Sequence, residues 1–434
     1  MKGFIILFIA CVLMPGTASA QGWERQNSPT GNYLASVVFV DTCHGWAVGD
    51  SGTIIHTTDG GGTWVIQNTG TTLFLLAVDF VDVSNGWAAG YDNSGGWRGV
   101  VVHTTDGGGS WTTQSMDTTR FLAGVDFVDA NTGWAVGSTF SSYSVIMHTS
   151  DGGGSWTPQD GGTYPSVYDA EFVDGNNGWV VGGRIRFPGI PPLQLMLRTT
   201  DAGSTWTEQI YTADGPLLAV CFVDQDHGWA VGSDYGGGYF SIIIQTTDGG
   251  ETWIPRNPGS SAELSGVDFV DENHGWAVGS MSPEGATILR TTDGGAAWTT
   301  QTVHSSVTSL KDIRFFDANH GWAVGGGGTI LRYNPNLSAP DEYSDLQPSS
   351  FSLSTFPNPF NPSTTIAYDL PKAGHISLRV FDLLGREVAV LKDGFVEAGT
   401  HRVTFDGSGL ASGIYFARLD AEGSSQTKKL VLMR

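Results

Sequence analysis

Apolar and polar positions alternate in short runs along residues 23–333, and nearly every run ends at Gly, Asp or Asn. In one stretch the expected strands cover residues 73–81, 86–90, 100–105 and a segment that begins at Trp111. A period of two is typical of half-buried strands, and Gly, Asp and Asn are typical of the turns that connect them. The pattern therefore predicts an all-β fold of short strands.

The strands recur in a fixed order. A signal of the form Gly-Trp-Ala-Val-Gly occurs seven times at intervals of 41 to 50 residues, with its tryptophans at Trp46, Trp87, Trp134, Trp179, Trp229, Trp276 and Trp322. Six copies are followed by a second signal, Thr-Thr-Asp-Gly-Gly-x-Thr-Trp or a near variant. Four strands in a repeat of this length are typical of one blade of a β-propeller.

The two ends of the repeat region complement each other. The seventh repeat stops after its third strand, near residues 330–333, and lacks the second signal. Trp23-Glu24-Arg25-Gln26 matches the opening of a fourth strand such as Trp64-Val65-Ile66-Gln67. A first strand that completes the last blade removes an exposed sheet edge. We expect a seven-bladed β-propeller closed by an N-terminal strand.

The second signal resembles the Asp-box, or bacterial neuraminidase repeat. Its carboxylate can accept hydrogen bonds from its own turn, its glycines supply positive φ, and its Trp can pack between blades. Six catalytic or metal-binding carboxylates are the alternative, but repetition in every blade favours a structural turn. We expect structural roles, and no metal or cofactor, at Asp59, Asp106, Asp151, Asp201, Asp248 and Asp293.

The connections between second and third strands are long in blades two to six, and they share one face with the blade-to-blade connections. Loops on a rigid scaffold often carry binding residues, and aromatic side chains beside Arg suit a protein or glycan ligand. The alternative is that the loops bury their own aromatics. The candidate binding residues are Tyr91, Trp97, Arg98, Phe140, Tyr143, Arg184, Arg186, Phe187, Tyr235, Tyr239 and Phe240.

A second candidate group follows the innermost strands. One position per repeat reads Val38, Asp79, Asp126, Glu171, Cys221, Asp268 and Arg314. If this position borders a central channel, Asp79, Asp126, Glu171 and Asp268 line it together with Arg314. Such carboxylates suit a cation or a basic peptide, and a solvated channel wall is the alternative. A sialidase site would need three axial Arg and a Tyr nucleophile beside a Glu, so we expect no catalytic residues.

The net charge excludes some classes of ligand, and the positions of the cysteines and histidines indicate structural roles. Residues 21–337 hold 11 Lys and Arg against 32 Asp and Glu, which disfavours binding to nucleic acid or anionic membranes. Cys43 and Cys221 lie in well-separated repeats and are poor disulfide partners. Four histidines occupy one turn position in separate repeats, which indicates one structural role: His44, His227, His274 and His320.

Residues 1–20 have the features of a secretion signal, with Lys2, an apolar run and Ala18-Ser19-Ala20 before Gln21. The propeller is expected over 21–333 and a Pro- and Ser-rich linker over 334–350. Residues 351–434 form a separate module of about seven short strands. Its motifs are FPNPFNP at 356–362, VFDLLGREV at 380–388, AGTH at 398–401, SGIYF at 412–416 and KKL at 428–430.

This module resembles the C-terminal sorting domain of the type IX secretion system, a small immunoglobulin-like β-sandwich similar to a domain of the flagellar hook-capping protein. The resemblance implies the secretion machinery as a partner, passage through the periplasm, and delivery to the cell surface or medium, with removal of the module.

The repeated motifs Phe-Val-Asp and Gly-Trp-Ala-Val-Gly cover residues 23–333. In these motifs the chain resembles the photosystem II assembly and stability factor family of seven-bladed Asp-box proteins. The resemblance implies partner binding through a basic Arg patch. This chain departs from that pattern because it is acidic and its arginines are scattered. We expect a secreted, monomeric, non-catalytic propeller that binds protein or glycan. The alternative is an Asp-box-type glycoside hydrolase that acts on extracellular polysaccharide through a carboxylate pair in the channel.

Overall fold

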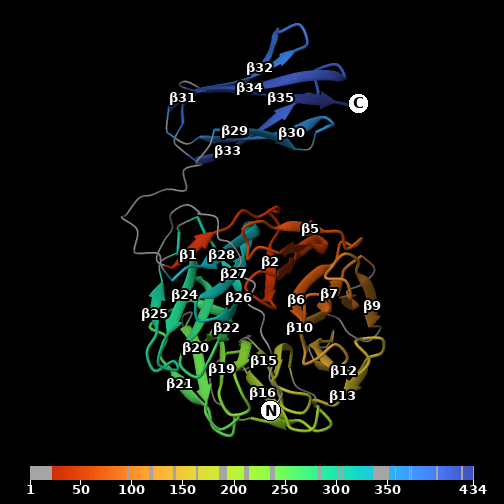
Figure 1. The fold of residues 1–434 in the computed structure, drawn as a ribbon, viewed down its shortest axis with the longest axis vertical. Coiled ribbons are helices and arrows are strands. Elements are labelled where there is room, and N and C mark those ends of the chain that lie inside the picture. The colour runs from red at the N-terminus through yellow and green to blue at the C-terminus, as the bar shows by residue number, and fades with distance from the viewer. Residues whose placement is uncertain are drawn as a thin grey trace, which may run out of the picture. The chain divides into compact units, whose positions relative to one another are not determined.

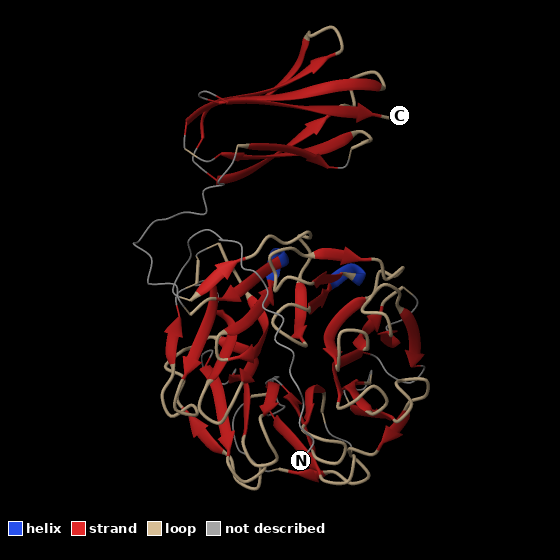
Figure 2. Cartoon of the chain, in the orientation of Figure 1, coloured by secondary structure: helices blue, strands red, loops and turns tan. Residues whose placement is uncertain are grey.

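The structure is a computed structural model, and its strands dominate both parts of the chain (Figure 2). It describes residues 22–335 and 351–433 apart from 95–97, 117–120, 140–142, 163–164, 185–192, 210–214, 235–239, 282–284, 302, 305, 357, 371, 373, 397–398 and 422–423. The chain divides into two compact units, Met1–Ala339 and Pro340–Arg434. In the described ranges, no helix has the length and apolar character needed to cross a membrane.

Within its described residues the first unit contains seven four-stranded sheets, called blades here. Six of them follow chain order from the first to the fourth strand, and the seventh takes its fourth strand from the N-terminus. Blade one has β2 (Leu34–Phe39), β3 (Gly45–Gly49), β4 (Ile54–Thr57) and β5 (Val65–Gln67). Blade two has β6 (Phe74–Phe80), β7 (Gly86–Asp92), β8 (Arg98–Thr104) and β9 (Thr112–Met116). Blade three has β10 (Phe121–Phe127), β11 (Gly133–Ser138), β12 (Ser144–Thr149) and β13 (Thr157–Gln159).

The remaining blades repeat this plan. Blade four has β14 (Val167–Phe172), β15 (Gly178–Arg184), β16 (Leu193–Thr199) and β17 (Thr207–Glu208). Blade five has β18 (Leu217–Phe222), β19 (Gly228–Asp234), β20 (Phe240–Thr246) and β21 (Ile254–Arg256). Blade six has β22 (Glu263–Phe269), β23 (Gly275–Met281), β24 (Gly285–Thr291) and β25 (Thr299–Gln301). Blade seven has β26 (Leu310–Asp317), β27 (His320–Gly325), β28 (Thr329–Tyr333) and β1 (Trp23–Arg25).

The blades surround a common axis, with first strands such as β2, β6 and β10 toward the middle and fourth strands such as β5, β9 and β13 at the rim (Figure 1). Short 3-10 turns at Asp50–Gly52 and Gly326–Gly328 connect the second and third strands of blades one and seven. The expected all-β propeller is confirmed.

The N-terminal strand completes the last blade, as the sequence predicted. β1 pairs antiparallel with β28, and Trp23 lies opposite Tyr333. Trp23 Nε1 donates a hydrogen bond to Gln301 Oε1 of blade six (2.8 Å), just as Trp156 Nε1 donates to Gln114 Oε1 between blades three and two (3.1 Å). Trp23 therefore takes the place of an Asp-box tryptophan in blade seven.

Each pair of neighbouring blades is joined by aromatic stacking. In blade two the β6 residue Phe80 stacks on Trp46 of blade one, with ring centroids 3.7 Å apart, and Trp111 of the Asp-box packs edge-on against Phe80. Trp46 Nε1 also donates to Gly107 O in the Asp-box of blade two (3.1 Å). The equivalent stacked pairs are Phe39–Trp322, Phe127–Trp87, Phe172–Trp134, Phe222–Trp179, Phe269–Trp229 and Phe315–Trp276.

The glycine before each repeated Trp makes this packing possible. A Cβ added to Gly86 would lie 2.3 Å from the Phe80 ring, and the equivalent Gly45 faces the Phe39 ring at the same distance. The phenylalanine of the first strand therefore covers the backbone of the second strand, which leaves no room for a side chain. This close approach explains the Gly-Trp pair of the repeated signal.

The second unit contains two sheets around one hydrophobic core that includes Leu353, Phe360 and Leu419. One sheet has the order β29-β30-β33, from β29 (Ser352–Phe356), β30 (Ser363–Leu370) and β33 (Gly399–Asp406). The other has the order β32-β31-β34-β35, from β31 (Gly374–Asp382), β32 (Glu387–Val396), β34 (Gly413–Ala421) and β35 (Ser424–Leu432). An immunoglobulin-like classification of this unit stays a prediction.

Candidate functional site

The Asp-box carboxylates are engaged by their own turns. Asp106 Oδ1 accepts hydrogen bonds from Ser110 N–H and Thr104 Oγ1, and Oδ2 accepts from Ser110 Oγ, all at 2.8 Å. The Ser110 bonds and the Thr104 bond lower the pKa of Asp106 below its usual value. The same backbone bond, from the residue four positions later, is accepted by Asp59, Asp151, Asp201, Asp248 and Asp293.

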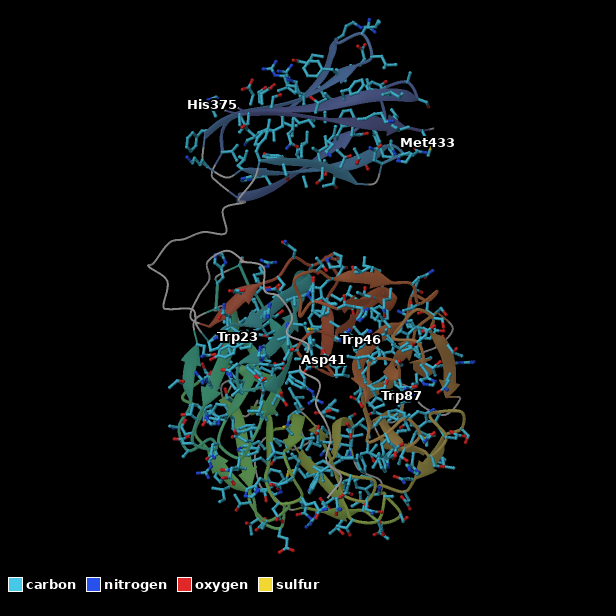
Figure 3. All side chains as sticks on the ribbon, viewed as in Figure 1. Trp23, Asp41, Trp46, Trp87, His375 and Met433 are labelled. Carbon is cyan, nitrogen blue, oxygen red and sulfur yellow. The ribbon has the colours of Figure 1, made fainter. Side chains whose placement is uncertain are left out.

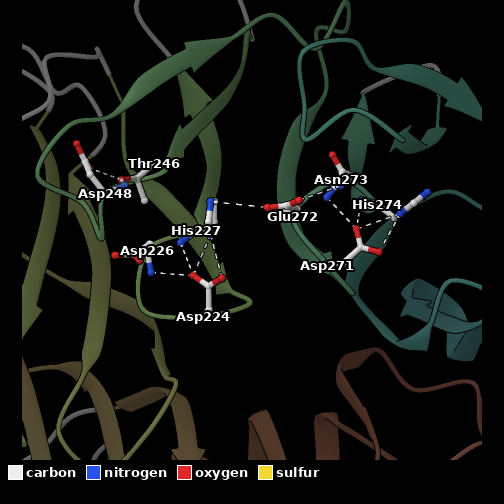
Figure 4. A network of polar contacts seen from close by, with 9 residues as sticks. All are labelled: Asp224, Asp226, His227, Thr246, Asp248, Asp271, Glu272, Asn273 and His274. Atoms are coloured by element: carbon white, nitrogen blue, oxygen red, sulfur yellow. Dashed lines mark hydrogen bonds and ion pairs between the residues drawn. The ribbon is translucent and has the colours of Figure 1, made fainter.

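The turns between first and second strands lie beside these boxes. Gly107 N–H donates to Ser84 O (2.9 Å), and Gly249 N–H donates to Asp226 O (2.9 Å), so both features share one face. His227 Nδ1 lies 2.9 Å from Asp224 Oδ2, and its Nε2 lies 3.9 Å from Glu272 Oε2 of the next blade (Figure 4). His274 is paired in the same way with Asp271 at 2.9 Å.

The sequence pattern identified the turn histidines but missed their partners. In each case the partner is an Asp three positions earlier, and the pairs are Asp41–His44, Asp224–His227, Asp271–His274 and Asp317–His320. The same Asp also accepts from the backbone of the turn, as Asp224 does from His227 N–H at 2.7 Å. A fixed Asp-x-x-His spacing in four repeats was the available signal.

The opposite face carries the connections between second and third strands, and we call it the variable-loop face. Four of the candidate binding residues on this face lie in the described part of the chain. Tyr143 is 51% exposed, before β12, and its N–H donates to Thr139 Oγ1. Arg98 is exposed at the start of β8. Tyr91 stacks on Phe74 with centroids 5.0 Å apart, and Arg184 is half-buried at the end of β15.

These four residues lie at the same ends of strands in blades two, three and four. The other candidates lie outside the described residues: Trp97, Phe140, Arg186, Phe187, Tyr235 and Tyr239. Phe240 begins β20, and its side chain is also outside the description.

The inner-strand candidates form one ring, because each pairs in register with the repeated Trp of its blade. Asp79 lies opposite Trp87, Glu171 opposite Trp179, and Arg314 opposite Trp322. Asp79, Asp126 and Asp268 are at most 9% exposed. This burial differs from the solvated channel wall that was one alternative reading of the sequence.

The buried carboxylates of this ring connect neighbouring blades. Phe127 N–H donates to Asp79 Oδ2 (2.8 Å), Phe172 N–H donates to Asp126 Oδ2 (2.7 Å), and Phe315 N–H donates to Asp268 Oδ2 (2.5 Å). Each bond joins a carboxylate to the first strand of the following blade. We call these interactions the inter-blade bonds.

Two further inter-blade bonds involve residues that sequence reasoning missed. Val220 N–H donates to Asp169 Oδ2 and Val37 N–H donates to Asp312 Oδ2, both at 2.9 Å. Asp169 lies two positions before Glu171, and Asp312 two positions before Arg314. Alternate residues of a strand share one face, so this spacing was a usable signal.

Burial dominates the electrostatics of the ring. It raises the pKa of Asp169 to about 7, of Glu171 to about 8 and of Asp268 to about 6. It also raises the pKa of Asp79 and Asp126, and for Asp126 the neighbouring Glu171 adds to the effect.

Arg314 opposes these shifts. Its Nη1 lies 3.5 Å from Asp268 Oδ1, and its side chain is 34% exposed. Cys221 is buried with its Sγ 3.7 Å from the same Asp268 oxygen, and Cys43 is buried in another blade. Among the residues that the structure describes, no group of three or more His, Cys, Asp and Glu side chains is arranged to hold a metal ion.

Comparisons with known proteins agree with both resemblances found in the sequence. A family model described as photosynthesis system II assembly factor YCF48 matches residues 16–119, 109–211 and 260–334. A model described as secretion system C-terminal sorting domain matches residues 354–433. No curated protein sequence matches the chain.

Among solved structures, "YCF48 bound to D1 peptide" is 22% identical with a TM-score of 0.57, over 73% of this chain and 99% of that one. YCF48 from Cyanidioschyzon merolae is 20% identical with a TM-score of 0.56, over 72% and 99%. The GH74 xyloglucanase from Xanthomonas campestris is 13% identical with a TM-score of 0.55, over 80% and 59%. At these identities the similarity shows the fold.

Proposed function

The chain belongs to the photosynthesis system II assembly factor YCF48 family, and we propose that it is a non-catalytic propeller that binds a protein segment outside the cell. Its C-terminal sorting domain directs export by the type IX secretion system to the cell surface or the extracellular space. The photosynthetic role of the family name is not carried over, because fold and family do not define a ligand.

The proposal that the propeller is non-catalytic rests on the hydrogen bonding of its carboxylates. The buried carboxylates Asp79, Asp126 and Asp268 and the half-buried Asp169 and Asp312 each accept a backbone hydrogen bond from the following blade. The Asp-box carboxylates are engaged by their own turns in the same manner. A general acid or base must be able to reach a substrate proton, and carboxylates committed to the scaffold are poorly placed for that task.

The binding part of the proposal rests on the variable-loop face. Tyr143, Arg98 and Arg184 belong to three successive blades and lie at strand ends of the same face. Aromatic and Arg side chains in such positions are typical binding hot spots. The relative solved as "YCF48 bound to D1 peptide" supports a peptide as the ligand class, ahead of a glycan.

The binding proposal can be tested with the full mature chain purified from a host that exports it. The double variant Arg98→Ala/Tyr143→Ala should reduce recovery of a surface protein about tenfold or more after cross-linking, since hot-spot truncations have effects of this size. Val65→Ala is the matched control, because Val65 is 63% exposed on the rim strand β5. Equal recovery from wild type and the double variant would contradict the assigned face.

The alternative function, glycoside hydrolysis, has one observation in its favour. Burial raises the pKa of Glu171 to about 8, so this carboxyl would hold a proton at neutral pH, as a general acid does. Incubation of the full chain with polysaccharides and chromogenic glycosides separates the two functions. The non-catalytic proposal expects no turnover, whereas turnover that Glu171→Gln abolishes would establish the hydrolase.

A further inference from the structure

The most exposed large apolar side chains of the described chain lie in the C-terminal unit. Leu384 is 78% exposed and Leu383 is 67% exposed, and both occupy the turn between β31 and β32. Turn positions are usually filled by Gly, Asn, Asp or Ser, so local geometry does not demand two leucines here.

This turn is held in one conformation. Asp382 Oδ1 accepts hydrogen bonds from the N–H groups of Leu384 and Arg386 (both 2.9 Å), and Arg386 Nε lies 2.8 Å from Asp382 Oδ2. Asp382 N–H donates to Arg386 O, Gly385 N–H donates to Asp382 O, and Gly385 has a φ of +77°. The leucines are therefore presented by an ordered turn, which lowers the entropy cost of burying them in a partner.

Two other exposed apolar residues belong to the same end of the sheet. Asp382 at the end of β31 pairs with Tyr415, so the turn lies beside Ile414, which is 37% exposed. Ile414 pairs with Val431 of β35, and Met433, 52% exposed, follows two residues later. Leu383, Leu384, Ile414 and Met433 thus gather at one end of the unit, and we call them the distal patch.

The distal patch lies away from the point where the chain enters the unit. Gln426 Nε2 donates to Phe351 O (2.6 Å), so the first described residue of the unit lies near the start of β35, whereas Met433 follows its end. Figure 3 shows His375, at the start of β31, and Met433 at opposite ends of the unit. Phe351 and the distal patch therefore lie at opposite ends of this unit.

The border of the patch is basic. The Arg386 side chain is 74% exposed, and Lys428 and Lys429 are exposed on β35. Both carboxylates next to the turn are paired with arginines: Asp382, 16% exposed, with Arg386, and Glu387, 39% exposed, with Arg379 at 2.7 Å. A complementary surface would therefore combine an apolar pocket with carboxylates at its rim.

We propose that the distal patch is the docking surface of the sorting domain for a protein of the secretion machinery that presents an apolar pocket with an acidic rim. This inference depends on the family match of residues 354–433 and is independent of the ligand proposed for the propeller. Exposed apolar clusters on a soluble domain commonly mark interaction sites, and a sorting domain must be recognised by a protein.

The test uses the full chain in a bacterium with a type IX secretion system. Leu383→Ser/Leu384→Ser should lower surface delivery on the order of tenfold or more, because apolar anchors dominate interface affinity. The conservative variant Leu383→Met/Leu384→Met should restore delivery. Phe395→Ser is the matched control, since Phe395 is 63% exposed but pairs with His375 at the other end of the sheet, and its delivery should stay normal.

The melting temperature and the oligomeric state of the variants show whether a loss of export comes from lost recognition. The purified double Ser variant should melt at the wild-type temperature, which separates lost recognition from lost folding. Normal export of that variant, or an equal loss with Phe395→Ser, would overturn the proposal. A wild-type dimer that becomes monomeric in the double variant while export continues would also overturn it, and would assign the patch to a second copy of the chain.

Discussion

At the residue scale, the propeller uses its acidic side chains as structural acceptors in two different environments. The Asp-box carboxylates are exposed or half-buried and are bonded to their own turns. The pKa of Asp151 falls to about 2 through the Ser155 backbone and side-chain bonds. The inter-blade carboxylates are buried or half-buried, and loss of solvent raises their pKa. The two groups therefore respond to pH in opposite directions.

The sign of the pH dependence follows from these shifts. Asp169 has a folded pKa of about 7, above its ordinary value of 3.8, so the folded state retains its proton over a range where the unfolded state has lost it. Stability falls as pH rises through that range. The box carboxylates have a lowered pKa, so they affect stability at lower pH. The stability that they contribute is lost as pH falls from 3.8 toward about 2. We expect the highest melting temperature near pH 4 to 5.

Variants of Asp169 test this assignment. Asp169→Asn keeps an oxygen that accepts from Val220 N–H but removes the buried charge, so it should melt higher than wild type at pH 8 and equal to it near pH 5. Asp169→Ala also removes the charge but leaves that N–H without an acceptor, so it should be about 1–3 kcal/mol less stable than Asp169→Asn at both pH values. Thermal melting followed by circular dichroism gives the comparison. A lower melting temperature for Asp169→Asn at pH 8 would show that the charged form stabilises the ring.

At the element scale, each blade has a close contact between the phenylalanine of its first strand and the glycine before the repeated Trp of its second strand. A Cβ at position 86 would overlap the Phe80 ring, and displacement of that ring would disturb its stacking on Trp46. Gly86→Ala should therefore destabilise the propeller by about 1–3 kcal/mol or more, the usual cost of overpacking. Gly31→Ala is the matched control, because nothing lies within 4 Å of its added Cβ. Similar melting temperatures for the two variants would refute this account of the repeated Gly-Trp pair.

The N-terminal strand supplies a second prediction at this scale. Removal of residues 21–28 deletes β1 and leaves the edge of β28 unpaired, and it also removes the buried Trp23. Exposed strand edges promote aggregation, and loss of a buried Trp side chain costs about 3–5 kcal/mol. The shortened protein should aggregate or melt far lower in light scattering and calorimetry. A monomer with the wild-type melting temperature would show that β1 does not close the ring.

The sequence predicted the strand order and the closure because both depend on local repetition, with period-two alternation inside strands and fixed signals between them. Trp23 was identified in this way. The roles of Asp79, Asp126 and Asp268 could not be predicted, because a carboxylate that faces a channel and one that bonds the next blade have the same spacing. The stacked phenylalanines were missed for a similar reason, since their partners lie in the neighbouring blade, as Trp46 does for Phe80 and Trp322 does for Phe39.

At the scale of the whole molecule, the chain divides into two compact units. The sorting domain lies in the second unit, and the propeller closes with strands of the first unit alone. Removal of residues 338–434 should therefore leave a folded propeller that accumulates in the periplasm, as measured by fractionation and protease protection. A fusion of a signal peptide, a reporter and residues 338–434 should reach the surface. Surface delivery of the shortened chain would refute the sorting role.

The most direct test of the central claim, a binding propeller whose ligand is a protein on the variable-loop face, is site-specific photo-cross-linking of the exported chain. A photoreactive residue at position 143 should capture a surface protein in intact cells. The same residue at position 254, which is 44% exposed on the rim strand β21, should not. Capture from position 254 with none from position 143 would contradict the account.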